Sequence, residues 1–184
     1  MARKLDQIIV VDLEATCWEG EPPAGEQSEV IEIGLCVLDV VREERLENRA
    51  LLVKPQRSNL SPYCTELTTL TQEQLDGGMP FQQACQILIE EYDSRHRTWA
   101  SYGDYDRFQM QSQCASWGID YPFGYSHINV KNLLALHLKL KREVGLAYAL
   151  DLLDMPLEGT LHRGIDDAWN IAAVLVRVLY QGSG

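Results

Sequence analysis

The sequence predicts an α/β domain in which a mixed five-stranded sheet is flanked by helices. Three segments rich in β-branched and apolar residues come first, and helical patterns then alternate with a further strand. The 184 residues, 46% of them hydrophobic, suffice for one full core and are too few to favour two. We therefore expect a single domain over residues 1–184.

Strands are expected near the N-terminus at residues 8–11, 30–38 and 49–54. A charged hairpin at 42–47 joins the second strand to the third, and residues 18–28, rich in Glu, Pro and Gly, form a loop above the end of the first. Three consecutive strands of this kind predict an antiparallel start to the sheet.

The next segment is expected to form two helices and the fourth strand. A capping-box pattern at 71–74 opens a short helix that Gly77-Gly78 ends. A longer helix begins at Pro80, because proline suits the first turn, and its apolar residues form one stripe. Residues 98–101 form the strand. The stripe comprises Phe81, Ala84, Cys85, Leu88 and Tyr92.

Four further helices complete the expected fold. They lie at 106–117, where Gly118 stops the helix, and at 132–142, 146–153 and about 165–179. The sequence shows no repeats, low-complexity tracts or interdomain linker.

The formal net charge of −11, from 27 acidic and 16 basic residues, argues against broad electrostatic binding to long duplex DNA. A short single strand needs few phosphate contacts, so this charge is compatible with a nucleic-acid enzyme. No apolar stretch approaches the roughly 18 residues of a membrane span, and no signal-peptide core is evident. We expect a soluble, cytoplasmic protein without a membrane partner.

Two carboxylates stand one residue apart where the first strand should end, at Asp12 and Glu14. Residues i and i+2 of a strand project from the same face, so the two point together. They repel one another, and their placement beside an apolar strand is costly unless a cation neutralises them. A divalent metal is the expected cation. Zinc is not indicated, because the five cysteines form no Cys-x-x-Cys pair.

Two further acidic pairs, Asp104 with Asp106 and Asp166 with Asp167, lie where helices begin. Helical spacing places Asp106 and Asp167 on inward, apolar faces and Asp166 on an outward face, and Asp104 is expected as an N-cap. Each alone could serve only to stabilise the helix macrodipole, by about 0.3–1 kcal/mol. Capping does not explain the Asp-x-Glu at a strand end, or His162 five residues before an inward aspartate.

In combination, these residues resemble the DEDDh class of 3′-to-5′ exonucleases, which have the ribonuclease H-like fold. Its first motif, Asp-x-Glu-x-Thr, is matched by residues 12–16. Its second, a single Asp, is matched by Asp106, and its third, His-x-x-x-x-Asp, by His162 and Asp167. The likeness spans about residues 5–181, which we expect to be the core of the domain.

Within that class the chain resembles the ERI branch, the three-prime exonucleases of small-RNA and histone-message processing. A short chain of this kind is also similar to the bacterial sporulation-inhibitor relatives of that branch. The segments that carry this likeness are 12–17, 29–34, 103–106, 128–131 and 162–172.

The resemblance implies a metal-dependent exonuclease that shortens single-stranded nucleic acid from its 3′ end, RNA in preference to DNA, and releases nucleoside 5′-monophosphates. The resemblance implies two divalent ions. Oxygen-only ligands favour Mg²⁺, which Mn²⁺ can replace, over zinc. His162 would be the general base. The implied catalytic residues are Asp12, Glu14, Asp106, His162 and Asp167, of which Asp12, Glu14, Asp106 and Asp167 are the metal ligands.

For the substrate's 3′ end, the resemblance indicates the backbone just after the Asp-x-Glu, at Ala15 and Thr16. Trp18 lies in the loop that follows. It could stack on the terminal base, a contact worth about 1–3 kcal/mol, or pack under the Pro22-Pro23 loop.

Cations that follow motif elements are candidate phosphate contacts, namely Lys131, Arg107 and Arg163. Tyr105 and Phe108 flank Asp106 and are expected in the core rather than against bases. The expected partners are 3′ ends of single-stranded RNA or DNA, and the sequence does not identify any protein partners.

Two other functions stay open. A regulatory or partner-binding module on the same fold would be expected to have lost at least one of the five catalytic residues, and all five are present. A metal-dependent phosphatase or nucleotide pyrophosphatase would use similar carboxylates, but it should also show a Gly-rich phosphate loop, and none is evident.

Overall fold

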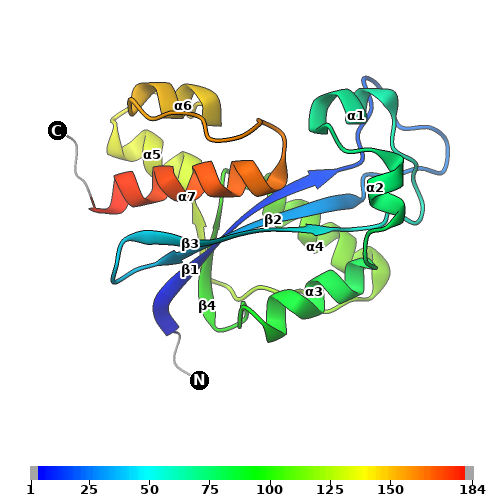
Figure 1. Cartoon of the computed structure of the whole chain (residues 1–184), viewed down its shortest axis with the longest axis horizontal. Coiled ribbons are helices and arrows are strands. Elements are labelled where there is room, and N and C mark those ends of the chain that lie inside the picture. The colour runs from blue at the N-terminus through cyan, green and yellow to red at the C-terminus, as the bar shows by residue number, and fades with distance from the viewer. Residues whose placement is uncertain (1–3, 181–184) are drawn as a thin grey trace.

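Five strands form one sheet in the order β3-β2-β1-β4-β5 (Figure 1). β1, β2 and β3 pair antiparallel, whereas β4 pairs parallel with β1 and β5 parallel with β4. The expected mixed, five-stranded sheet with an antiparallel start is therefore confirmed. The strands are β1 (Lys4–Ala15), β2 (Val30–Asp39), β3 (Glu44–Leu52), β4 (Arg97–Ser101) and β5 (His127–Asn129).

The structure is a computed structural model that describes residues 4–180. Gln181, the last residue of the expected core, lies outside this range. None of the helices within the range is long and apolar enough to cross a membrane. The helices are α1 (Pro62–Thr68), α2 (Gln72–Asp76), α3 (Phe81–Glu90), α4 (Tyr105–Trp117), α5 (Val130–His137), α6 (Leu146–Leu152) and α7 (Gly164–Tyr180).

Helices cover both faces of the sheet (Figure 1). α5, α6 and α7 lie on one face, α3 and α4 lie on the other, and α1 and α2 lie beside the end of the sheet where β1 terminates. Strand alternation explains this division, because successive side chains of β1 point to opposite faces. Ile8 and Val10 pack against the α7 layer, whereas Ile9, Val11 and Leu13 pack against the α3 and α4 layer.

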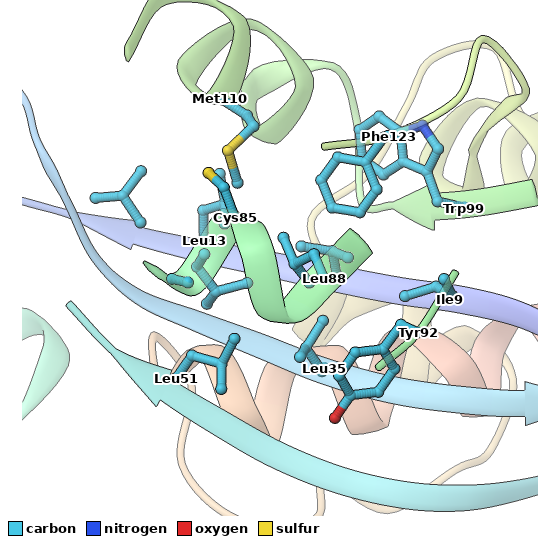
Figure 2. Close-up of a cluster of buried hydrophobic side chains, with 14 of the residues drawn as sticks. Ile9, Leu13, Leu35, Leu51, Cys85, Leu88, Tyr92, Trp99, Met110 and Phe123 are labelled. Atoms are coloured by element: carbon cyan, nitrogen blue, oxygen red, sulfur yellow. The ribbon is translucent and has the colours of Figure 1, made fainter. Parts of the chain in front are cut away.

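Figure 2 shows the core between the sheet and the α3 and α4 layer, where Leu88 of α3 and Met110 of α4 lie against the strands. Trp99 of β4 stacks on Phe123, with ring centroids 4.3 Å apart. The core includes all five residues of the predicted stripe, four of them in α3 and the fifth, Tyr92, just beyond the helix.

Several boundaries differ from the sequence prediction, and β1 extends well beyond the predicted residues 8–11 at both ends. The β2–β3 turn occupies residues 40–43 rather than 42–47, because the Asp39 carboxylate accepts hydrogen bonds from the backbone N–H groups of Val41 and Arg42 and closes the turn early. β3 consequently begins at Glu44 instead of residue 49. The expected helix at 132–142 runs from Val130 to His137 and stops well before residue 142.

The sequence analysis missed α1. Ser61 caps this helix, since its Oγ accepts a hydrogen bond from the Cys64 N–H at 2.9 Å, and Pro62 occupies the first turn. The same Oγ donates to the Cys17 carbonyl at 2.6 Å, which fastens α1 to the segment after β1. The Ser-Pro pair was therefore a usable helix-start signal.

Candidate active site

Asp12 and Glu14 project from the face of β1 that α7 covers. They alternate with Val11 and Leu13, which pack on the opposite face. The antiparallel register with β2 places Gly34 beside Asp12 and a third carboxylate, Glu32, directly beside Glu14. Acidic side chains therefore gather at the end of β1.

Asp106 reaches the same place from the first turn of α4. Its side chain is buried, and its Oδ1 accepts a hydrogen bond from the Leu13 backbone N–H at 2.9 Å. This bond ties the start of α4 to the strand residue that lies between Asp12 and Glu14. Its inward direction agrees with the helical spacing.

Asp167 lies in the first turn of α7 and is buried, as its spacing predicts. Its Oδ2 accepts a hydrogen bond from the His162 backbone N–H at 2.7 Å. Its Oδ1 is buried and has no hydrogen-bond partner among residues 4–180. A buried carboxylate oxygen without a donor is costly unless a cation or water reaches it.

His162 is exposed and adopts a left-handed backbone conformation, with φ of 61°. Its ring nitrogen, a Glu14 carboxylate oxygen and an Asp167 carboxylate oxygen all lie within 4.8 Å of one another. Asp166 is not fully outward as predicted: it is half-buried, and its Oδ2 accepts a hydrogen bond from the Thr160 N–H at 2.9 Å. The segment before α7 covers this side of the helix.

One cavity of about 350 Å³ brings together all five residues of the predicted catalytic set. Ala15, predicted to contact the substrate, also lines it. Its wall includes apolar and aromatic side chains from β1, α1, α4 and α6. The other lining residues are Leu13, Cys17, Leu67, Tyr102, Tyr105 and Leu146.

Burial raises the pKa of every carboxyl in this cavity, and repulsion between neighbouring carboxylates adds to the shift at Asp12, Glu14 and Asp167. Burial and the charges of Asp106 and Glu14 raise the pKa of Asp12 well above its usual range. Burial and the Asp167 charge raise the pKa of Glu14 to about 8. Burial likewise raises the pKa of Asp106 and that of Asp167 to about 6, although backbone hydrogen bonds oppose the shift. Such a cluster favours bound cations, which stabilise the charged forms.

Glu32 is a fully buried carboxylate that sequence reasoning did not place in the site. Its Oε2 accepts hydrogen bonds from the Gly164 N–H at 2.9 Å and from Arg163 Nε at 3.3 Å. It thereby holds the segment that carries His162. A glutamate inside an otherwise apolar strand was the signal that could have identified it.

Close packing of two glycines brings α7 to the sheet. A Cβ on Gly34 would lie 1.8 Å from the Gly164 carbonyl oxygen, so only glycine fits at this point of β2. The contact sets the N-terminus of α7, and with it Asp167, directly above the strand that carries Glu32.

The remaining predicted substrate residues are not among the residues that line the cavity. Thr16 is buried, and its Oγ1 accepts from the Glu29 N–H at 2.9 Å while its own N–H donates to the Glu29 carbonyl at 2.8 Å. Trp18 is half-buried in the loop after β1. Lys131 Nζ lies 3.9 Å from Glu143 Oε2.

The residues around Asp106 depart from the prediction in two ways. Asp104 precedes α4 without a side-chain capping bond, because its carboxylate instead pairs with Arg107 at 2.8 Å. Tyr105 and Phe108 are each 57% exposed, so their assignment to the core was wrong. The inward face of α4 belongs to Asp106 and Met110, whereas Tyr105 lines the catalytic cavity and Phe108 is exposed.

The family model for exonucleases of the RNase T type matches residues 9–175. Rat 3′-5′ exoribonuclease 1 is 33% identical over 187 residues, which cover 96% of this chain and 54% of the rat protein. The 3′-5′ exonuclease Snipper of Drosophila melanogaster is 28% identical, with 96% of this chain and 70% of that protein covered. The chain spans about half the length of the mammalian exoribonuclease 1 proteins it matches.

Solved structures of exonucleases also superpose on this chain. The nuclease domain of 3′hExo, described as a DEDDh family member bound to rAMP, superposes with a TM-score of 0.88 at 30% identity and covers 96% of this chain and 93% of its own. A complex described as 3′-end-specific recognition of the histone mRNA stem-loop by 3′-exonuclease gives a TM-score of 0.87 at 29% identity, with coverages of 99% and 84%. Exonuclease I, 11% identical with a TM-score of 0.76, shares the fold.

Proposed function

The chain belongs to the exonuclease family of the RNase T type and to its DEDDh class, and on this premise we propose that it is a metal-dependent 3′-to-5′ exonuclease of single-stranded nucleic acid. The observation that carries the proposal is the convergence of Asp12, Glu14, Asp106, His162 and Asp167 on one cavity. We expect RNA rather than DNA to be the preferred substrate of this chain, because several relatives are named exoribonucleases. The products would be nucleoside 5′-monophosphates.

The four acidic residues of the cavity, Asp12, Glu14, Asp106 and Asp167, would hold two Mg²⁺ ions, with Mn²⁺ as a substitute. Their donor atoms are all carboxylate oxygens, which suit these hard cations. Asp167 Oδ1 is buried with no hydrogen-bond partner in the described chain and so offers a ligand atom. When bound, two such ions activate the attacking water and neutralise charge on the phosphate and the departing 3′ oxygen.

His162 would take the proton of the attacking water. Its ring is exposed at the cavity, while its backbone N–H is fixed to Asp167. The ring can therefore accept a proton from a water molecule in the cavity, and the hydrogen bond keeps the residue beside the acidic cluster. Glu32 and Arg163 position this segment from the β2 side.

The test is a time course with 5′-labelled single-stranded RNA and DNA of one sequence, in Mg²⁺, Mn²⁺ or EDTA. We expect a metal-dependent ladder of products that shortens from the 3′ end, faster for RNA. Asp12→Ala should abolish it without lowering the melting temperature, because it removes one of several repelling carboxylates. Asp6→Ala, on the exposed start of the same strand, is the matched control and should retain the ladder.

An absence of shortening for both strands, although Mg²⁺ raises the melting temperature, would contradict the exonuclease. That result would favour the regulatory or partner-binding module on the same fold.

A further inference from the structure

Basic residues gather in the connection between α5 and α6. Lys139, Lys141 and Arg142 are all exposed there. The sequence from residue 121 to residue 142 contains no aspartate or glutamate, although the whole chain has 27. A cationic segment therefore stands on an otherwise acidic molecule. We call residues 139–142 the basic loop.

The cations of the basic loop lack ion-pair partners within residues 4–180, whereas most lysines and arginines elsewhere have one. The three cations that follow motif elements, which were candidate phosphate contacts, each lie next to an acidic residue. Arg163 binds Glu32, Arg107 binds Asp104, and Lys131 lies near Glu143. The basic loop is thus where positive charge is both clustered and free to meet a ligand.

The basic loop leads into the wall of the catalytic cavity. Leu146, four residues after Arg142, lines that cavity, as does Tyr102. The Tyr102 hydroxyl donates a hydrogen bond to the Val144 carbonyl at 2.9 Å, which fixes the end of the connection to the cavity wall. α5 and α6 lie on the same face of the sheet as α7, which carries Asp167 (Figure 1).

We propose that the basic loop binds backbone phosphates of the substrate strand on the 5′ side of the nucleotide being removed. The inference rests on the proposed function and extends it to the path of the strand. Lysine and arginine side chains in an exposed loop contact phosphates without reading bases, so this contact is independent of sequence. The net charge of −11 repels a polyanion elsewhere, which leaves this loop as the favourable exit from the cavity.

Binding is tested with a 5′-fluorescein-labelled ten-nucleotide RNA and the Asp12→Ala protein, by anisotropy over a series of NaCl concentrations. Each phosphate contact contributes about 0.7 to the slope of log K against log salt for single strands. Arg142→Gln should lower the slope by about this amount, and Lys141→Gln/Arg142→Gln by about twice as much. Arg42→Gln removes from the β2–β3 turn an exposed cation that has no ion-pair partner within residues 4–180, and it should leave the slope unchanged.

The same substitutions, in the protein with Asp12 intact, are then compared on the ten-nucleotide RNA and on a dinucleotide. The preference in kcat/KM for the longer strand should fall several-fold in the double variant and stay as in the wild type in Arg42→Gln. Equal salt slopes for the double variant and Arg42→Gln, or no binding of the RNA at low salt, would overturn the proposal. A slope that depends on the loop, with both substrates left intact by the wild type, would support the binding path and reject the exonuclease.

Discussion

Backbone conformation at single residues decides how the catalytic groups meet. His162 sits in the left-handed region with its N–H bound to Asp167, so the two residues of the third motif are joined before any ligand arrives. The motif spacing gave both residues and the inward direction of Asp167. It could not give this turn, because the positive φ at His162 goes with a hydrogen bond to Asp167 that forms only in the folded chain.

His162→Asn separates a proton-transfer role from a metal-ligand role. Asparagine tolerates the left-handed backbone, so the turn should survive, but it cannot act as a base near neutral pH. We expect kcat to fall by about 10²–10⁴-fold. The rise in melting temperature caused by Mg²⁺ should be largely retained. Loss of the Mg²⁺ effect would instead identify the ring as a ligand, which its position beside Glu14 and Asp167 permits.

His96→Asn is the control for this experiment. His96 is an exposed histidine that contacts Asp93 at the start of β4, away from the cavity. Its replacement should change neither kcat nor the Mg²⁺ response. A similar loss of rate in both variants would contradict the assignment of the base.

Strands and helices position the carboxylates of the site, and the periodicity of the sequence predicted much of this arrangement. The two-residue period of β1 predicted that Asp12 and Glu14 share a face, and the helical period predicted that Asp106 and Asp167 point inward. The position of Glu32 in an apolar strand marked it as unusual, but its role could not be predicted, because that role follows from the register between β1 and β2 and from the approach of α7. Such pairing between distant segments has no local signature in one sequence.

Gly34→Ala tests the contact between β2 and α7. The added methyl group would overlap the Gly164 backbone, so α7 must move away from the sheet and carry Asp167 with it. Overpacking of this kind typically costs about 1–3 kcal/mol, which lowers the melting temperature of a chain this size by several degrees. Activity should fall by more than the loss of folded protein explains. Thermal unfolding measures the change in stability, and the nuclease time course measures the change in activity.

Gly20→Ala is the matched control, since no atom lies within 4 Å of the Cβ that it would add. It should leave the melting temperature and the activity unchanged. Equal behaviour of the two alanine variants would show that the close glycine contact does not determine the position of α7.

At the scale of the whole molecule, the acidic cluster couples stability to pH. The pKa of Glu14 is raised to about 8, and those of Asp106 and Asp167 to about 6. The folded protein therefore binds protons that the unfolded chain, with carboxyl pKa values of about 4, has already lost. Stability must then decrease as pH rises from about 4 to 8 in the absence of metal.

The corresponding measurement is thermal unfolding in EDTA and in Mg²⁺ between pH 5 and pH 8. The melting temperature in EDTA should fall by several degrees across this range, and Mg²⁺ should raise it most at pH 8, where the carboxylates are charged. Glu14→Gln should make the fall in EDTA shallower, because it removes one titrating group. A melting temperature in EDTA that does not depend on pH would contradict the raised pKa values.

The order of the elements along the chain has a consequence for synthesis. Asp12 lies in the first strand and Asp167 in the last helix, and Asp106 lies between them. A growing polypeptide on the ribosome can fold the antiparallel strands early, but it has no complete acidic cluster until α7 has emerged and packed on the sheet. The proposed hydrolytic activity would therefore require α7 to have folded onto the sheet, whatever the state of β1.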